Sequence, residues 1–290
     1  GLTTREDDAV ENMFVCSSHD YIMLFSNLGR MYRIKAYEIP EGSRTAKGMN
    51  IVNILPLMPE EKITIILPAS ELDEERFITM VTKKGIIKRT KLSEFRHTRK
   101  SGIIAISIDE DDELTFVKLT NGDDNLLIAT KKGMAIQFNE NGVRAMGRGA
   151  RGVKAITIRE DDEVVAMEVT DENTRLLTIT ETGYGRVSPI SDYRLQSRGG
   201  KGLINYRVDK YGDVAAVLEV TDNDDIIMIA SNGILIRIFS GDISTFARPA
   251  KGVRVMRVGE GEKVLSVAVT EHSEDEETSL PDAPEADAGL

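Results

Sequence analysis

The sequence contains no tryptophan, one cysteine and three histidines among its 290 residues, and aromatic residues make up only 5%. A single cysteine excludes an internal disulfide, and Cys16 lies in an apolar segment where a small core residue is expected rather than a nucleophile. The three histidines are too few and too scattered for a clustered metal site. No run of about 18 apolar residues and no signal peptide is present, so we expect a soluble protein without a membrane partner.

Five glycines mark a regular spacing along the chain. Gly102, Gly152, Gly202 and Gly252 are separated by 50 residues each, and Gly48 lies 54 residues before Gly102. Two cationic residues lie within the four positions before each of these glycines. A fixed period of this length is typical of an array or a propeller, in which one supersecondary unit is repeated.

Each repeat reads as four short strands. An apolar run such as Leu126–Ala129 precedes a tight glycine turn, a mixed run follows it, and two more runs, including Ile103–Ile108, flank an acidic turn such as Asp109–Glu113. Short β-branched runs bounded by Gly, Asn and Asp indicate strands. No segment shows the sustained spacing of an amphipathic helix. The best helical candidate is short, Ser70–Arg76, with Ser70 as its N-cap.

Four strands in about 50 residues describe one blade of a propeller. The expected fold class is therefore all-β, a propeller-like ring of about six four-stranded blades. Five complete repeats lie in this chain, and a partial one is expected at its beginning, because Arg5–Ala9 (REDDA) is a further copy of the acidic turn. The pattern leaves open whether these repeats close into a full ring.

The net charge of −11 is unevenly distributed. Residues 271–290 contain eight acidic residues and no Lys or Arg, so removing them leaves 40 acids against 37 cations in residues 1–270. This segment has little to bury, and we predict a disordered acidic tail over residues 271–290. Within residues 1–270, acids and cations gather in different turns. A nearly neutral body can therefore present a positive rim, which attracts a polyanion.

The motif QSRGGKG, Gln196–Gly202, is the most developed basic loop. Its adjacent glycines allow the backbone to approach a ligand closely, and its N–H groups with two cations offer a compact anion site. The other copies, SRTAKG, HTRKSG, GRGARG and ARPAKG, keep the cations and the last glycine. Five such loops in phase favour sequence-independent contacts with duplex DNA over ordinary solvated turns. The lack of interleaved aromatics disfavours a single-stranded target.

The residues expected to contact DNA lie in or beside these loops, and no catalytic or metal-binding residue is expected. They are Arg44, Lys47, Arg96, Arg99, Lys100, Arg144, Arg148, Arg151, Arg194, Gln196, Ser197, Arg198, Gly199, Gly200, Lys201, Gly202, Arg248 and Lys251.

Over essentially all of residues 1–270, the chain resembles the C-terminal domain of the DNA gyrase A subunit. QSRGGKG is similar to that family's gyrase A box. The segment His19–Gly48, followed by Ile51–Leu57, looks like the family's first complete repeat after the box. The family places its box in the first blade, so the motif at Gln196–Gly202 is expected to be a second, later copy.

The resemblance implies a β-pinwheel, a six-bladed relative of the propeller in which blades exchange strands. It implies that residues 1–270 wrap and bend double-stranded DNA around a basic rim and so support negative supercoiling. It also implies partners, namely the remainder of gyrase A together with gyrase B, in an ATP-dependent type II topoisomerase of the bacterial cytoplasm and nucleoid. The catalytic tyrosine, the ATPase and the magnesium site belong to other parts of gyrase, so this domain is expected to have no catalytic activity and no cofactor.

Two other functions stay open at this point. The equivalent domain of topoisomerase IV has the same blades, usually with a worn box and little chiral wrapping, and the intact box here favours gyrase. A propeller that serves as a protein-interaction scaffold is the alternative from a different class, and the phased cations disfavour it.

Overall fold

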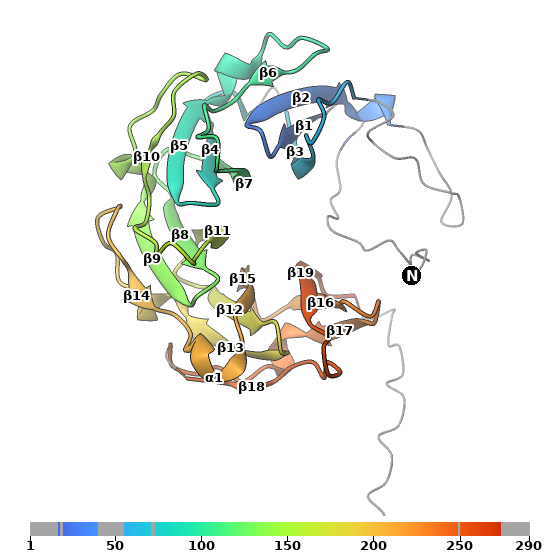
Figure 1. Cartoon of the computed structure of the whole chain (residues 1–290), viewed down its shortest axis with the longest axis vertical. Helices are drawn as coiled ribbons and strands as arrows, with labels where there is room; N and C mark the ends of the chain where they lie inside the picture. The colour runs from blue at the N-terminus through green and yellow to red at the C-terminus, as the bar shows by residue number, and fades with distance from the viewer. Residues whose placement is uncertain (1–16, 18–19, 40–54, 71–72, 249, 274–290) are drawn as a thin grey trace, which may run out of the picture.

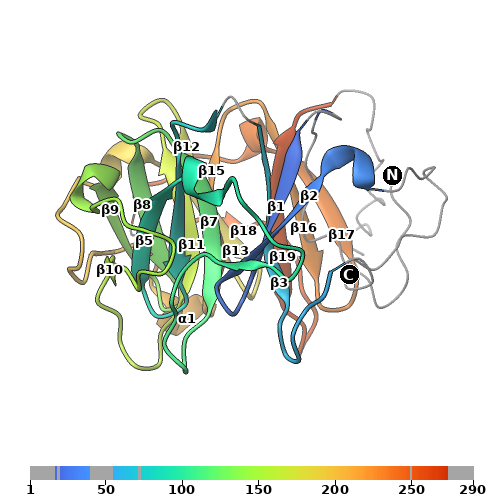
Figure 2. The same cartoon turned by 90° about the horizontal axis from the view of Figure 1, so that it is seen from above.

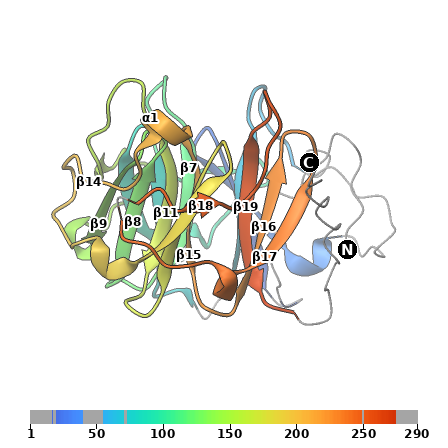
Figure 3. The same cartoon turned by 90° about the horizontal axis from the view of Figure 1, so that it is seen from below.

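A computed structural model describes residues 17, 20–39, 55–70, 73–248 and 250–273, which form five antiparallel sheets arranged along an arc (Figure 1). Among the described residues, the arc is open between the first sheet and the fifth. In the edge-on views of Figures 2 and 3 the strands run along the short axis of the arc. Each sheet is built on a hairpin that closes at a glycine turn. The hairpins are β1 (Tyr21–Ser26) with β2 (Arg30–Lys35), β4 (Phe77–Thr82) with β5 (Ile86–Lys91), β8 (Asn125–Thr130) with β9 (Met134–Asn139), β12 (Arg175–Thr180) with β13 (Tyr184–Pro189), and β16 (Asp224–Ala230) with β17 (Leu235–Phe239).

The innermost strand of each sheet follows the acidic turn of the same repeat. It pairs with the first strand of the hairpin, and the innermost strands of neighbouring sheets contact one another along the inside of the arc (Figure 1). These strands are β3 (Ile63–Ala69), β7 (Leu114–Thr120), β11 (Val164–Thr170), β15 (Val214–Val220) and β19 (Val264–Glu271).

The outermost strand of a sheet comes from the following repeat. Four strands of two residues each leave their own repeat and pair with the hairpin of the preceding sheet: β6 (Ile103–Ile104), β10 (Val153–Lys154), β14 (Leu203–Ile204) and β18 (Val253–Arg254). Four sheets are therefore four-stranded, and the fifth has three strands in the described part of the chain. The propeller-like all-β fold and the exchange of strands between blades are confirmed. The partial repeat at Arg5–Ala9 lies outside the described residues.

One expectation about local structure is wrong. The run Ile103–Ile108 is a strand only over its first two residues, because Ala105 and Ile106 then turn inward, and both N–H groups donate to the carbonyl of Gly29. Of the short helical candidate Ser70–Arg76, the structure describes Ser70 and residues 73–76. Asp73 has 3-10 conformation, and its carboxylate accepts from the Ser70 N–H at 3.1 Å. Among the described residues the one α-helix is α1 (Val208–Tyr211), which replaces an acidic turn.

The core is divided into layers between neighbouring sheets. Leu126 and Ile128 of β8 pack toward the second sheet, whereas Leu127 and Ala129 of the same strand pack toward the fourth. Both faces of these hairpin strands are thus buried, which removes the alternation of polar and apolar residues that a half-exposed strand would show. This explains why the sequence before each glycine turn is a continuous apolar run.

The last glycine of a basic loop is required by the strand exchange. At Gly152 φ is +99°, and an added Cβ would lie 2.4 Å from the carbonyl oxygen of Ile87 in the preceding sheet. We therefore predict that Gly152→Ala lowers the free energy of unfolding by about 1–3 kcal/mol, through backbone strain and this clash. Thermal and urea unfolding measure the change.

Gly200 gives a matched control, because an added Cβ there meets nothing within 4 Å and its φ is not positive. Gly200→Ala should leave stability within about 0.5 kcal/mol of the original chain. Equal unfolding midpoints for the two variants would contradict the steric account.

Candidate nucleic-acid interface

The basic loops lie on the outer edge of the arc, next to β6, β10, β14 and β18 (Figure 1). We call residues 96–102, 144–152, 194–202 and 244–252, without the undescribed residue 249, the rim loops. Each of the last three is fixed to the preceding sheet at both ends. Its start forms an isolated parallel bridge with the hairpin, such as Arg89 with Ala145, and its end runs into the exchanged strand. The exchange thus places successive basic loops on one edge.

Two rim loops are also bonded to the segment that follows the preceding exchanged strand. Ser107, just after β6, donates its hydroxyl to Gly149 at 2.8 Å, and Thr157, just after β10, donates its hydroxyl to Gly199 at 2.6 Å. The N–H groups of the same two residues donate to Ala150 and Gly200. The rim loops therefore form a continuous belt rather than independent turns.

Three predicted DNA-contacting arginines join their rim loops to the preceding exchanged strands. The guanidinium of Arg148 donates to the carbonyl of Ile104 at 3.0 Å, that of Arg198 donates to Lys154 at 3.1 Å, and that of Arg248 donates to Ile204. Each arginine reaches the second residue of the exchanged strand that precedes its own loop. Their side chains are half-buried, and part of each guanidinium is already engaged within the protein.

Other predicted cations are exposed and unengaged. Within the described ranges, the side chains of Arg99, Lys100, Arg144, Arg194 and Lys201 make no hydrogen bond, ion pair or ring contact. Their charge is uncompensated by neighbours, and their long side chains extend from loops whose backbone is fixed. This subset is the part of the predicted site best suited to phosphate oxygens.

Three more predicted cations are exposed but have partners. Arg96 forms an ion pair with Glu74, Arg151 lies 2.6 Å from the Asp109 carboxylate, and Lys251 stands over two tyrosine rings. The Lys251 ammonium is 4.6 Å from the ring centroid of Tyr184. Surface pairs of this kind are weak, and a phosphate can replace them at little cost.

The remaining predicted residues have different surroundings. Arg44 and Lys47 lie outside the described residues. Ser197 and Gly200 are exposed, whereas Gln196 donates its N–H to Gln137 and has a buried side-chain oxygen without a hydrogen-bond partner in the described chain. Gly199 and Gly202 have positive φ, and Gly202 has the same close packing against the preceding sheet as Gly152.

Sequence reasoning missed further exposed cations of the belt. Lys154 and Arg254 are the second residues of exchanged strands, and Arg207 follows such a strand by three positions. They lie after the loop glycine, outside the motif of two cations before that glycine. The signal that could have found them is the repeat register, since Lys154 and Arg254 occupy equivalent positions.

Two cations missed by sequence reasoning are buried behind the belt. Lys88 and Arg186 each stand three residues after a glycine turn and have no exposed surface. The ammonium of Lys88 donates to Ala105, Gly147 and Arg148, and the guanidinium of Arg186 donates to Ala250 and Asn205. Each cation thus joins the segment after one rim loop to the next rim loop. Burial lowers the pKa of the Lys88 ammonium to about 8, so it remains largely charged at pH 7.

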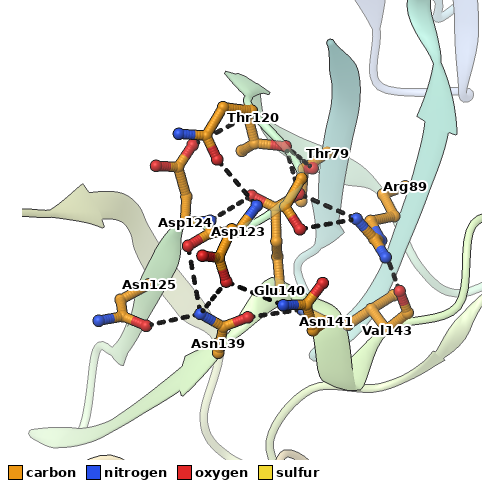
Figure 4. Close-up of polar contacts among 12 residues, drawn as sticks. Thr79, Arg89, Thr120, Asp123, Asp124, Asn125, Asn139, Glu140, Asn141 and Val143 are labelled. Atoms are coloured by element: carbon orange, nitrogen blue, oxygen red, sulfur yellow. Dashed lines mark hydrogen bonds and ion pairs between the residues drawn. The ribbon is translucent and has the colours of Figure 1, made fainter. Parts of the chain in front are cut away.

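A buried ion pair fixes the start of the loop at 144–152 (Figure 4). Arg89 of β5 donates to the Val143 carbonyl and lies 3.1 Å from the carboxylate of Glu140, which also accepts from Thr120 at 3.0 Å and from the Asp124 N–H at 2.9 Å. Arg33 and Gln137 bond the starts of two other loops at Arg96 and Tyr193 in the same way. A side chain of each of these sheets therefore positions the next rim loop.

The acidic turns lie beside the glycine turns of the hairpins, and one of them also contacts a rim loop, through the ion pair of Asp109 with Arg151. Asp112 and Asp162 cap backbone N–H groups at Lys84 and Lys132, and the lysines of the KKG turns pair with acids such as Glu163. Part of the negative charge of these turns is therefore paired with cations. The described ranges contain no group of three or more potential metal-ligating side chains. Within the same ranges, no helix has the length and apolar character needed to cross a bilayer.

We predict that Glu140→Ala destabilises the fold by about 3–5 kcal/mol, because it leaves the Arg89 guanidinium buried without its counter-charge. Equilibrium unfolding in urea measures the loss. The double variant Arg89→Met with Glu140→Leu is the control and should recover much of the stability, since it buries no unpaired charge. Equal destabilisation in both variants would show that packing rather than charge sets the cost.

We also predict that two arginines of one rim loop differ in effect. Arg198→Met removes the hydrogen bonds of the guanidinium to the carbonyls of Gly142 and Lys154. It should lower the free energy of unfolding by about 1–2 kcal/mol, after allowance for solvent screening. Arg194→Met should leave the unfolding midpoint unchanged but make the salt dependence of DNA binding shallower by about 1. A loss of stability for Arg194→Met, or none for Arg198→Met, would contradict the assignment.

Comparisons with known proteins identify similar repeats. The family described as the DNA gyrase C-terminal domain, beta-propeller, matches residues 20–70, 76–121, 124–171, 174–221 and 224–271. Each of these five segments contains the hairpin and the innermost strand of one sheet, and each matches one repeat read from the sequence.

Curated relatives match about half of the chain. The DNA gyrase A protein of Clostridium acetobutylicum is 54% identical over 151 residues, and that of Halalkalibacterium halodurans is 48% identical over 152 residues. Each match covers 52% of this chain and 18% of the relative, so the chain corresponds to a small part of their length.

Two solved structures share the fold over most of the chain. The C-terminal domain of DNA topoisomerase IV is 25% identical, with a TM-score of 0.83, and covers 93% of this chain and 85% of its own. A DNA gyrase A C-terminal domain is 27% identical, with a TM-score of 0.76, over 90% of this chain and 89% of its own.

Proposed function

Because the chain belongs to the DNA gyrase C-terminal domain family, we propose that its five sheets bind duplex DNA along the rim loops and bend it around the outer edge of the arc. The observation that carries this proposal is the bonded belt of rim loops. It joins unengaged cations on one edge, as a sequence-independent grip on the phosphate backbone requires.

The belt supports bending as well as binding. Bending duplex DNA through a half turn over about 40 base pairs costs roughly 10 kcal/mol by scaling its elastic stiffness. Rim cations held on a rigid curved support can offset this cost through phosphate contacts that release counterions. Cations on independent flexible turns would follow straight DNA instead.

The function in the intact protein follows from the relatives, which are subunits of a type II topoisomerase. We infer that this region wraps a DNA segment for an ATP-dependent gyrase, together with the rest of gyrase A and with gyrase B, and so supports negative supercoiling. DNA cleavage and ATP hydrolysis are assigned to other parts of that bacterial, cytoplasmic enzyme, and no catalytic step or cofactor is assigned to this region.

A topoisomerase IV function is the second candidate. It is favoured by the higher TM-score, 0.83 against 0.76 for the gyrase A domain. The gyrase assignment is favoured by the intact motif at Gln196–Gly202 and by the names of the relatives of 48–54% identity. The two candidates differ in chiral wrapping rather than in DNA binding.

We expect the chain to bend a duplex of about 40 base pairs, and its affinity to fall with salt with a log–log slope of about −6 to −9, corresponding to roughly seven to ten neutralised phosphates. Fluorescence anisotropy gives the slope, and energy transfer between the labelled DNA ends gives the bend. A slope shallower than about −3, without bending, would contradict gripping along an arc and support a protein-interaction scaffold.

Ligation of a nicked plasmid on the bound chain separates the two topoisomerase candidates. A change in linking number that grows with bound protein supports the gyrase assignment. Binding and bending without such a change support the topoisomerase IV assignment.

A further inference from the structure

Four consecutive carbonyl groups of one rim loop are held by the protein. The Lys88 ammonium donates to Gly147 at 2.8 Å and to Arg148 at 2.6 Å. Ser107 donates its hydroxyl to Gly149 at 2.8 Å and its N–H to Ala150 at 3.2 Å. The carbonyls of residues 147–150 are therefore all committed to groups inside the belt.

These hydrogen bonds also fix the direction in which the N–H groups of the loop point. In a trans peptide the N–H points away from the carbonyl of the same unit, and the described chain has no cis peptide bond. The bound carbonyls of Gly147 and Arg148 thus direct the N–H groups of Arg148 and Gly149 away from Lys88. Neither N–H donates to any described residue, and Gly149 is exposed. Two adjacent N–H groups on one side of a turn form a concave site for an anion.

The motif QSRGGKG lacks this arrangement. The N–H of Gly199, the counterpart of Gly149, donates to Ala155 at 2.6 Å and is not available to a ligand. The counterpart of Lys88 in the sheet behind this loop is Ile136, which cannot bind carbonyl groups. The loop with the more degraded motif therefore has the better prepared backbone.

We propose that the N–H groups of Arg148 and Gly149 bind one phosphate of duplex DNA, and that Lys88 is a positioning residue that holds this site open. The proposal rests on the proposed DNA-binding function and names a contact within it. The buried charge of Lys88 stands behind the N–H groups and adds to the attraction for an anion. Exposed Arg144, in the same loop, adds a further positive charge, whereas Arg151 is paired with Asp109.

Gly149 allows a test by a matched pair of variants. An added Cβ at this position meets nothing within 4 Å, and its φ is not positive, so Gly149→Ala keeps the N–H without a clash. Gly149→Pro removes the N–H. With about 40 base pairs of DNA at 0.1 M salt, we expect Gly149→Pro to bind about eightfold more weakly, with a salt slope shallower by about 0.9, as loss of one phosphate contact requires. Gly149→Ala should bind like the original chain.

Lys88 is tested by charge and by pH. Lys88→Met should lose affinity to a similar extent, and Lys88→Arg should retain it, because Arg186 occupies the equivalent position in the fourth repeat. In the original chain affinity should fall as pH rises through about 8, where the Lys88 ammonium, lowered in pKa by burial and by Arg148 and raised by Glu94, loses its proton. Lys88→Arg should show no such fall between pH 7 and 9, since its guanidinium does not titrate there.

The outcomes separate this inference from the proposed function. If the original chain binds and bends DNA while Gly149→Pro and Gly149→Ala bind equally, the phosphate site is wrong and the DNA-binding function stands. If the original chain does not bind DNA, the proposed function itself fails. Backbone amide chemical shifts give a direct reading, because the N–H signals of Arg148 and Gly149 should shift most within their loop when duplex is added. If Lys88→Met does not fold, the comparison of Gly149→Pro with Gly149→Ala still tests the phosphate site.

Discussion

The structure depends on one constraint: a sheet is completed by two residues that belong to the next repeat. Each exchanged strand is the end of a rim loop, so the pairing that completes a blade also places a basic loop on its outer edge. Glycine with positive φ is needed where the loop meets the preceding sheet, since backbone approaches backbone there. Stability and the position of the binding surface are therefore set by the same hydrogen bonds.

Cations serve two purposes on this edge. Some are turned inward, where Lys88 and Arg186 donate to clusters of carbonyl oxygens. Others, such as Arg144 and Arg194, are exposed and have no partner among the described residues. The inward group fixes the backbone from which the outward group extends. Since a fixed loop loses little conformational entropy on binding, the inward cations would favour the proposed DNA binding without touching the DNA.

Much of the fold could be predicted from the sequence because the repeat makes every local signal appear several times. The glycine turns, the four runs per repeat and the basic loops all lie where the period places them. The exchange of strands could not be read from the residues themselves, because Ile103 and Ile104 would look the same in either sheet, and it entered only through the family resemblance. The short length of that strand was also missed, because burial of Ala105 and Ile106 depends on the neighbouring blade.

The candidate site was predicted in outline and not in detail. Counting cations near a glycine found the rim loops, but it could not separate Arg198, which spans two loops, from Arg194, which is unengaged. Lys88 was missed because it lies in a strand, 60 residues from the Arg148 carbonyl that it binds. Both distinctions depend on contacts between repeats, which no single repeat contains. At the end of the chain, β19 extends to Glu271 and His272 bonds to Asp225, while residues 274–290 of the acidic segment lie outside the described residues.

The offset between repeat and sheet has a consequence for how such a chain can grow or be recombined. A repeat copied from the start of one hairpin to the start of the next does not carry a whole blade, since it brings an edge strand for the sheet before it and lacks one for its own. Every junction in a lengthened or shuffled array must therefore match two neighbours at once. Repeats are interchangeable only where an exchanged strand and the sheet edge that it pairs with are kept together. Gene duplication in this architecture is therefore constrained by pairs of neighbouring repeats rather than by single repeats.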